Sequence, residues 1–171
     1  VAFFVNLVSI TGQTKHNIPT LFTSDELSSS SSSSASVSHP ALLDSGTTLI
    51  NAPNSVYKAI GSAYGYHLPK LGYVEACDHW DGKNLTFTFD QGVEISVPVS
   101  QIMYPITKTN GKKWTLFGKP MCSVGVTDSG SQSIYILGDS FLRSAYVHYD
   151  LTNSQVGMAQ AKYTDASNIV A

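Results

Sequence analysis

In the stretch Leu42-Leu43-Asp44-Ser45-Gly46-Thr47-Thr48-Leu49-Ile50, a carboxylate stands between apolar residues and is followed by a small, hydroxyl-rich turn. The apolar flanks are typical of buried strands, where an ionised Asp is costly unless hydrogen bonds compensate its charge. Gly46 permits a positive φ and a close backbone approach, and Ser45 and Thr47 bring hydroxyl donors. The stretch therefore predicts a turn that holds one carboxyl group rigidly for a functional purpose.

Two apolar residues followed by Asp, Ser or Thr, Gly, and Ser or Thr resemble the active-site loop of pepsin-like aspartic proteases. A second motif, Ile134–Tyr146, resembles the segment and short helix that lie beside the catalytic loop in the carboxy-terminal lobe of that family. The ending, Tyr149–Leu151 followed by Gln155–Ala161, is similar to the last strand pair of secreted fungal members, the candidapepsins and yapsins. The resemblance is weakest from Thr20 to His39.

The resemblance implies a role for each residue of the loop. Asp44 would be a catalytic aspartate, Thr47 would hydrogen-bond its carboxylate, and Ser45 and Gly46 would complete the supporting turn. Substrate side chains would meet residues that match the family's pocket positions, namely Leu42, Thr48 and Ile136. The implied reaction is hydrolysis of a peptide bond by an activated water in acid, without a cofactor, and statine-type peptides would inhibit it.

Other aspartates are given plainer roles. Asp128-Ser129-Gly130-Ser131 repeats the Asp-Ser-Gly pattern, but no large aliphatic pair precedes it and no apolar run follows. It is therefore predicted to be a surface turn. Asp139 is predicted to be a helix N-cap, and Asp150 a turn residue.

One qualifying loop is half of what a pepsin-like enzyme needs. We therefore expect residues 1–171 to form a single carboxy-terminal lobe of a bilobal protease that is active only with an amino-terminal lobe carrying the second Asp. Two alternatives remain open. One is a homodimer in which Asp44 meets its own symmetry mate, and the other is a catalytically silent lobe that acts as a binding module.

Local patterns predict a mainly β lobe with two short helices. Val56, Ile60 and Tyr64 recur at helical spacing between Pro53 and Gly65. Two alternating runs, residues 85–89 and 93–99, predict a β-hairpin, whose second strand ends or lies at an edge because of Pro98. Residues 24–39 include seven consecutive serines and are expected to form a flexible insertion.

The composition of the whole chain argues against several partner classes. The chain has 171 residues, of which 42% are hydrophobic, so it has enough apolar residues for a sizeable core. Charged residues make up 13% and the net charge is −2, which offers no electrostatic case for nucleic acid or an anionic membrane. The five histidines show no spacing typical of metal ligands.

Cysteines and a sequon favour an oxidising compartment. Cys77 and Cys122 are too far apart for a redox or zinc motif, and one disulfide is favoured over two buried free thiols. Asn84-Leu85-Thr86 is a glycosylation sequon. We expect a secreted or cell-surface glycoprotein made as a zymogen. Val1 in place of an initiator Met suggests a processing boundary within a longer product.

Overall fold

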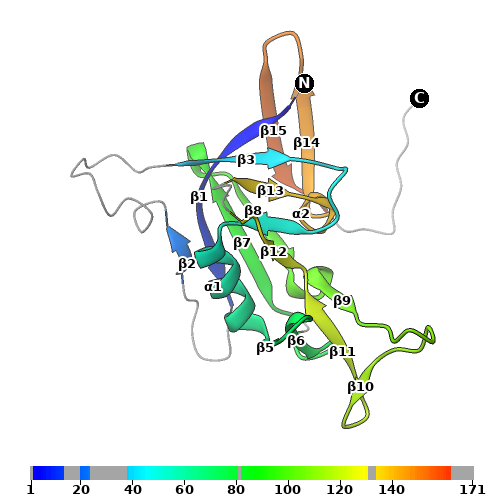
Figure 1. The fold of residues 1–171 in the computed structure, drawn as a ribbon. Coiled ribbons are helices and arrows are strands. Elements are labelled where there is room, and N and C mark those ends of the chain that lie inside the picture. Colours follow the sequence, from blue (N-terminus) through cyan, green and yellow to red (C-terminus); the bar gives the residue numbers. More distant parts are fainter. Residues whose placement is uncertain (1, 14–19, 24–37, 81, 131–133, 163–171) are drawn as a thin grey trace.

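The computed structural model describes residues 2–13, 20–23, 38–80, 82–130 and 134–162. Strands dominate, as predicted, and the two α-helices are short (Figure 1). The strands are β1 (Phe4–Gly12), β2 (Thr20–Thr23), β3 (His39–Leu43), β4 (Ile50–Ala52), β5 (Tyr66–Leu68), β6 (Gly72–Ala76), β7 (Asn84–Phe89), β8 (Glu94–Pro98), β9 (Met103–Pro105), β10 (Thr115–Leu116), β11 (Lys119–Val124), β12 (Val126–Asp128), β13 (Tyr135–Leu137), β14 (Ala145–Asp150) and β15 (Gln155–Gln160). The helices are α1 (Asn54–Tyr64) and α2 (Asp139–Leu142).

The strands form three sheets. An eight-stranded sheet has the order β12-β4-β13-β3-β1-β7-β8, with β2 also paired to β1. A five-stranded sheet has the order β10-β11-β6-β5, with β9 also paired to β11. The third sheet is the β14–β15 hairpin, which extends away from the other two (Figure 1).

The predicted hairpin is confirmed as β7 and β8, joined through Asp90–Gly92. Its second strand ends at Pro98 and lies at the sheet edge, where a residue without an N–H is tolerated. The side chains of Leu85, Phe87 and Phe89 are buried, whereas the threonines between them are half-buried. This alternation directs one face of the sheet into the core.

Helix α2 closes the core over this face. The Phe141 ring is fully buried and lies 5.1 Å from the ring of Phe87 and 5.8 Å from that of Phe89, measured between centroids. Burying one such phenyl group contributes roughly 1.5–3 kcal/mol to folding. The short helix is therefore fixed to the sheet by packing.

Helix α1 begins and ends where the sequence predicted. It follows Pro53, and the N–H of Gly65 bonds the Gly61 carbonyl at 2.8 Å where the helix ends. Val56, Ile60 and Tyr64 form its buried face. Gly61 is required by close packing, since a Cβ there would lie 2.1 Å from the Tyr73 ring.

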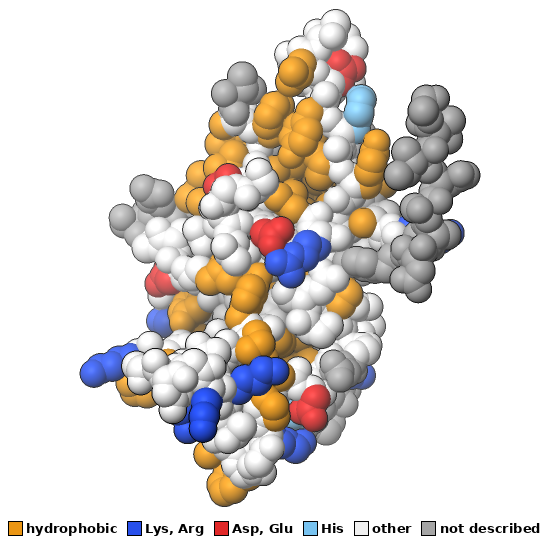
Figure 2. Space-filling view, turned by 90° about the vertical axis from the view of Figure 1, so that its right-hand side faces the viewer, with side chains coloured by type: hydrophobic (Ala, Val, Ile, Leu, Met, Phe, Trp, Pro, Cys, Tyr) orange, Lys and Arg blue, Asp and Glu red, His pale blue; other side chains and the backbone are white. Residues whose placement is uncertain are grey.

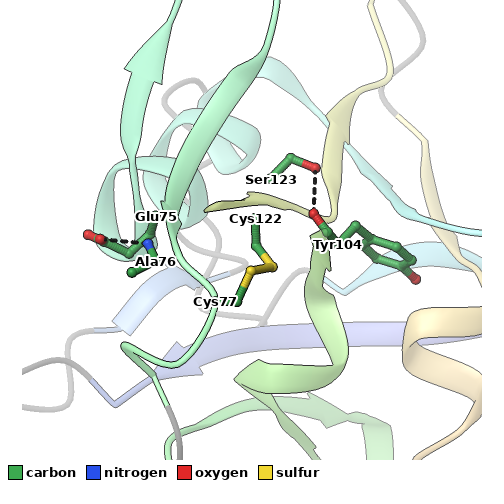
Figure 3. Close-up of a disulfide and its surroundings, with 6 residues drawn as sticks. All are labelled: Glu75, Ala76, Cys77, Tyr104, Cys122 and Ser123. Carbon is green, nitrogen blue, oxygen red and sulfur yellow. Dashed lines mark hydrogen bonds between the residues drawn. A yellow bond between two sulfur atoms is a disulfide. The ribbon is translucent and has the colours of Figure 1, made fainter. Parts of the chain in front are cut away.

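The predicted disulfide is present and joins the end of β6 to β11 (Figure 3). Cys77 and Cys122 are separated by 45 residues in sequence, and their Cα atoms lie 5.0 Å apart. Closing a loop of this length removes entropy from the unfolded chain equivalent to about 4 kcal/mol. The alternative of two free thiols is excluded.

Some predictions fall partly or wholly beyond the described residues. Of the proposed serine-rich insertion, residues 24–37 lie outside them, while its last residue, His39, begins β3. Within the described ranges, neither helix has the length and apolar character needed to cross a bilayer.

Candidate active site

Three short strands build the turn around Asp44. β13 lies between β3 and β4, parallel to the first and antiparallel to the second. The chain leaving β3 must therefore pass the end of β13 before it re-enters the sheet as β4. Leu43 is paired with Leu137, so Asp44 and Gly138 leave adjacent strands side by side. The Asp44 N–H bonds the Leu137 carbonyl at 3.2 Å and fixes this exit.

Both carboxylate oxygens of Asp44 receive a hydrogen bond. The Gly46 N–H donates to Oδ1 at 2.9 Å, and the Thr47 hydroxyl donates to Oδ2 at 2.7 Å. The Thr47 N–H also closes the turn on the Asp44 carbonyl at 3.2 Å. The Thr47 hydroxyl, followed by the Gly46 N–H, lowers the pKa of the Asp44 carboxyl, because both donors favour its charged form. The turn thus holds one ionised carboxylate in a fixed orientation.

Of the two possibilities that glycine permits at position 46, the structure does not use a positive φ, since Gly46 is not among the residues with positive φ. Close approach is the reason for glycine here. A Cβ at this position would lie 3.1 Å from Oδ1 of Asp44, the oxygen that the Gly46 N–H binds. A side chain would press on the carboxylate that the turn positions.

Position 138 also requires glycine, and the sequence alone did not show why. A Cβ there would lie 2.3 Å from the carbonyl oxygens of both Thr47 and Leu49. This close approach allows the Asp139 N–H to bond the Thr47 carbonyl at 2.7 Å and the Ser140 N–H to bond the Thr48 carbonyl at 3.1 Å. The start of α2 therefore braces the turn from behind.

Tyr104 is another brace that sequence reasoning missed. Tyr104 belongs to β9, in the five-stranded sheet. Its hydroxyl donates a hydrogen bond of 3.3 Å to the Thr48 carbonyl. No local motif surrounds Tyr104, and its partner lies 56 residues away. Only the fold brings the two together.

The predicted substrate residues lie on or beside the same strands. Leu42 and Ile136 are paired across β3 and β13, and both are half-buried, whereas their neighbours Leu43 and Leu137 are buried. They thus share the more open face next to Asp44. Thr48 is exposed in the turn itself, as is Ser45. The structure brings the predicted set together at one surface.

The Asp128 turn lies elsewhere, at the end of the edge strand β12, and its carboxyl is exposed. The Asn54 amide and the Gly130 N–H donate to this carboxyl and lower its pKa, in that order of effect. The prediction of a surface turn is confirmed.

Asp150 is also confirmed as a turn residue, because its carboxyl accepts from the N–H groups of Thr152 and Asn153. The N-cap prediction for Asp139 is wrong. Gly138 occupies the N-cap position, and Asp139 is the first residue of α2, where it pairs with Arg143. Because glycine is needed for the close approach to the turn, no side chain caps this helix.

Among the described residues, no group of three His, Cys, Asp or Glu side chains is placed to hold a metal ion.

Comparison with known proteins identifies relatives. Residues 5–161 match the model of the family described as eukaryotic aspartyl protease. An acid protease of Saccharomycopsis fibuligera is 50% identical over 134 residues, which cover 78% of this chain and 31% of that protein. Secreted aspartic protease 6 of Candida albicans is 42% identical over 135 residues, covering 76% of this chain and 30% of its own length.

A solved structure agrees on the fold. The crystal structure of basic 7S globulin from soybean superposes with a TM-score of 0.65, covering 94% of this chain and 39% of that one, at 16% sequence identity. At this identity the likeness concerns fold alone. The chain spans about a third of the length of the curated relatives named above. The family match and the identities of 42% and 50% show that this chain belongs to the pepsin-like aspartic protease family.

Proposed function

We propose that this chain is the carboxy-terminal lobe of a secreted aspartic endopeptidase and supplies one of its two catalytic carboxyls, Asp44. The observation that carries the proposal is the doubly hydrogen-bonded Asp44 carboxylate, held at a surface turn by Gly46 and Thr47. Such preorganisation of a charged group is what acid–base chemistry requires.

The chemistry needs two carboxyls that share one proton, since like charges a few ångströms apart do not both ionise. The ionised member accepts a proton from a bound water, which attacks the peptide carbonyl carbon. The protonated member donates a hydrogen bond to the carbonyl oxygen as negative charge develops there. The donors on Asp44 favour its ionised form, which suits it to activate the water, although the two carboxyls titrate as a pair.

The second carboxyl would come from another lobe. Asp128 has the matching Asp-Ser-Gly pattern, but it lies on a different turn, beyond the edge strand β12. The exposure of Ser45, Gly46 and Thr48 leaves the Asp44 turn open at the surface. A facing lobe would exclude water from this turn and strengthen its electrostatic interactions.

The β14–β15 hairpin supports the presence of such a lobe. Its strands pair only with each other among the described strands. Large apolar side chains are exposed on it and near it: Tyr146 at 65%, Leu151 at 70% and Phe4 at 48%. Figure 2 shows apolar side chains gathered over this upper part of the molecule. Exposed apolar patches of this kind mark interaction surfaces.

The proposed substrate is an extended peptide or protein chain. Leu42 and Ile136 would contact apolar substrate side chains beside the scissile bond, and Thr48 would contact the bound peptide. Statine-type peptides would occupy the same positions as inhibitors.

Secretion is proposed from two observations. Relatives in Candida albicans are named secreted aspartic proteases, and the disulfide suits an oxidising compartment. We further propose synthesis as a zymogen and glycosylation at Asn84, which opens β7 and is half-buried.

Cleavage of casein tests the proposal at about pH 4, near the ordinary pKa of an Asp. We expect no activity from the chain alone and activity once an amino-terminal lobe from a relative is added. Activity from the chain alone that rises with the square of its concentration would instead support the homodimer. Failure of every combination, with peptide binding retained, would favour a silent binding module.

A further inference from the structure

Two exposed turns project from the lower right of the molecule, the first sideways and the second downward (Figure 1). The first connects β9 to β10 and is closed by a hydrogen bond from the Lys108 N–H to the Lys112 carbonyl at 2.8 Å. The second is the β10–β11 turn, where Leu116 is paired with Lys119. Trp114 lies at the base of both turns, because its N–H bonds the Ile106 carbonyl at 2.8 Å and its carbonyl accepts from the Met121 N–H at 2.9 Å. We call residues 107–119 the basic tip.

Phe117, at the end of the basic tip, is unusual both in its exposure and in its backbone conformation. Its side chain is 97% exposed, and its φ is +49°, a left-handed conformation that disfavours a bulky residue. Gly118 follows with a φ of +80°. Positive φ at both positions of a two-residue hairpin turn is best served by Asn-Gly. Since Phe117 is unfavourable for the turn and adds almost nothing to the core, its value to the protein lies outside this fold.

The charged residues within the basic tip are all positive. Between Glu94 and Asp128 the sequence contains no acidic residue, whereas Lys108, Lys112, Lys113 and Lys119 all fall in the basic tip. Lys119 lies 4.0 Å from Asp78, and within the described ranges no ion pair engages the other three. Figure 2 shows basic side chains over the lower part of the molecule, with an acidic side chain among them. The overall net charge of −2 conceals this local excess.

We propose that the basic tip docks on the surface of an anionic lipid bilayer. Phe117 and Leu116, which is 44% exposed, would enter the interface, while the lysines contact headgroup phosphates. An apolar end flanked by lysines is the arrangement that binds interfaces. The tip is convex, so a folded acidic protein would need a matching pocket for Phe117. A bilayer closes around the ring without one. This function is separate from peptide hydrolysis and does not depend on Asp44.

Sedimentation of the full chain with lipid vesicles tests the proposal. Vesicles of phosphatidylcholine with phosphatidylserine should bind the chain, vesicles of phosphatidylcholine alone should bind it weakly, and high salt should release it. Phe117→Asn should weaken binding by about tenfold through lost apolar contact. The same variant should raise the melting temperature, because Asn suits the turn. A residue that served folding alone would not give these opposite shifts.

A triple variant tests the lysines. Replacing Lys108, Lys112 and Lys113 by Gln should weaken binding by about a hundredfold. The matched controls are Tyr66→Ser, which removes another exposed aromatic group, and Gln replacements of Lys58, Lys70 and Lys162, which remove the same charge. Both controls should bind as the parent chain does.

Three results would overturn the proposal. The first is equal binding to neutral and anionic vesicles, and the second is unchanged binding by Phe117→Asn. The third is tight binding to soluble polyglutamate that the triple lysine variant abolishes and Phe117→Asn does not alter. That third pattern would assign the basic tip to an acidic protein segment instead.

Discussion

The Asp44 and Asp128 turns share the sequence Asp-Ser-Gly and differ in almost everything beyond it. In both turns the glycine N–H donates to Oδ1 of the aspartate, at 2.9 Å from Gly46 and 2.8 Å from Gly130. This local bond is a property of aspartate-initiated turns. Identical local chemistry therefore says little about function.

The difference lies in what surrounds each turn. The Asp44 turn crosses the end of β13, and the N–H groups of Asp139 and Ser140 bond its carbonyls. The Asp128 turn follows an edge strand, and its second carboxylate oxygen accepts from the amide of Asn54. The Asp128 turn is also held by neighbouring elements, through Asn54 of α1 and a 2.8 Å bond from the Ser129 N–H to the Ala52 carbonyl of β4, but it lies at the edge of the sheet rather than at the end of strands within it. Position in the sheet, rather than the motif, makes one aspartate a catalytic candidate.

Replacing each aspartate by asparagine should separate the two turns most strongly. In the assembled protein, Asp44→Asn should reduce kcat for peptide cleavage by about 10²–10⁴-fold, because the acid–base group is lost. Asp128→Asn should leave kcat within about twofold, since an exposed turn residue away from Asp44 does no chemistry. A loss of kcat in a folded Asp128→Asn variant would contradict the view that Asp128 has no part in catalysis.

Disturbing the close packing of Gly138 against the Asp44 turn should lower the stability of the protein. Gly138→Ala would place a methyl group against two carbonyl oxygens at 2.3 Å, and it should lower the free energy of unfolding by about 2–3 kcal/mol. Gly157→Ala is the matched control, because its Cβ would meet nothing closer than 3.9 Å. Denaturant unfolding of the two variants measures the difference. Equal stability would show that the close approach is relaxed in solution.

Replacing the glycine of each motif by alanine should affect stability in one turn and activity in the other. Gly130 has a φ of +67° and open space around its missing Cβ, so Gly130→Ala should cost about 1–2 kcal/mol of stability and no activity. Gly46→Ala has no such strain, but its methyl group would meet Oδ1 of Asp44, so activity should fall more than stability. Denaturant unfolding and peptide cleavage, measured on both variants, check this crossed pattern. The reverse pattern would contradict it.

The smallest expected effect is on the pKa values of the two aspartate carboxyls. Thr47→Val should raise the pKa of Asp44 toward its ordinary value of 3.8, because the Thr47 hydroxyl is the main cause of the lowering. Asn54→Ala should do the same for Asp128. Carbon-13 NMR titration of the carboxyls measures both shifts in the full chain.

The lowered pKa values of these carboxyls should also make the stability of the fold depend on pH. A carboxyl with a lowered pKa in the folded state stabilises the fold above its unfolded pKa, and this contribution is lost as the pH falls through the folded value. The variants should therefore lose less stability than the parent chain between about pH 4 and acid extremes. Unchanged carboxyl titration in Thr47→Val would show that its hydroxyl does not hold Asp44.

Local sequence patterns predicted much of this molecule. Helix α1, the β7–β8 hairpin, the disulfide and the surface position of the Asp128 turn each depend on neighbouring residues or on a pair of cysteines, so periodicity and composition were sufficient. The direct bonds from Gly46 and Thr47 to Asp44 likewise lie within one turn.

Long-range contacts were not predictable in this way. Gly138 and Tyr104 contact the Asp44 turn only because β13 lies between β3 and β4 and because β9 approaches from another sheet. The N-cap expected of Asp139 was wrong because the fold places Gly138 at that position for close approach to the Asp44 turn. The basic tip was hidden by a whole-chain charge that averages over it.

A structure of the assembled protein with a peptide-like inhibitor bound is the most direct test of the proposed role of Asp44. The account predicts that the Asp44 carboxyl lies within hydrogen-bond distance, about 3 Å, of a second aspartate on the facing lobe, with the inhibitor across both. It would be contradicted if the Asp44 carboxyl faced bulk solvent while the inhibitor bound elsewhere.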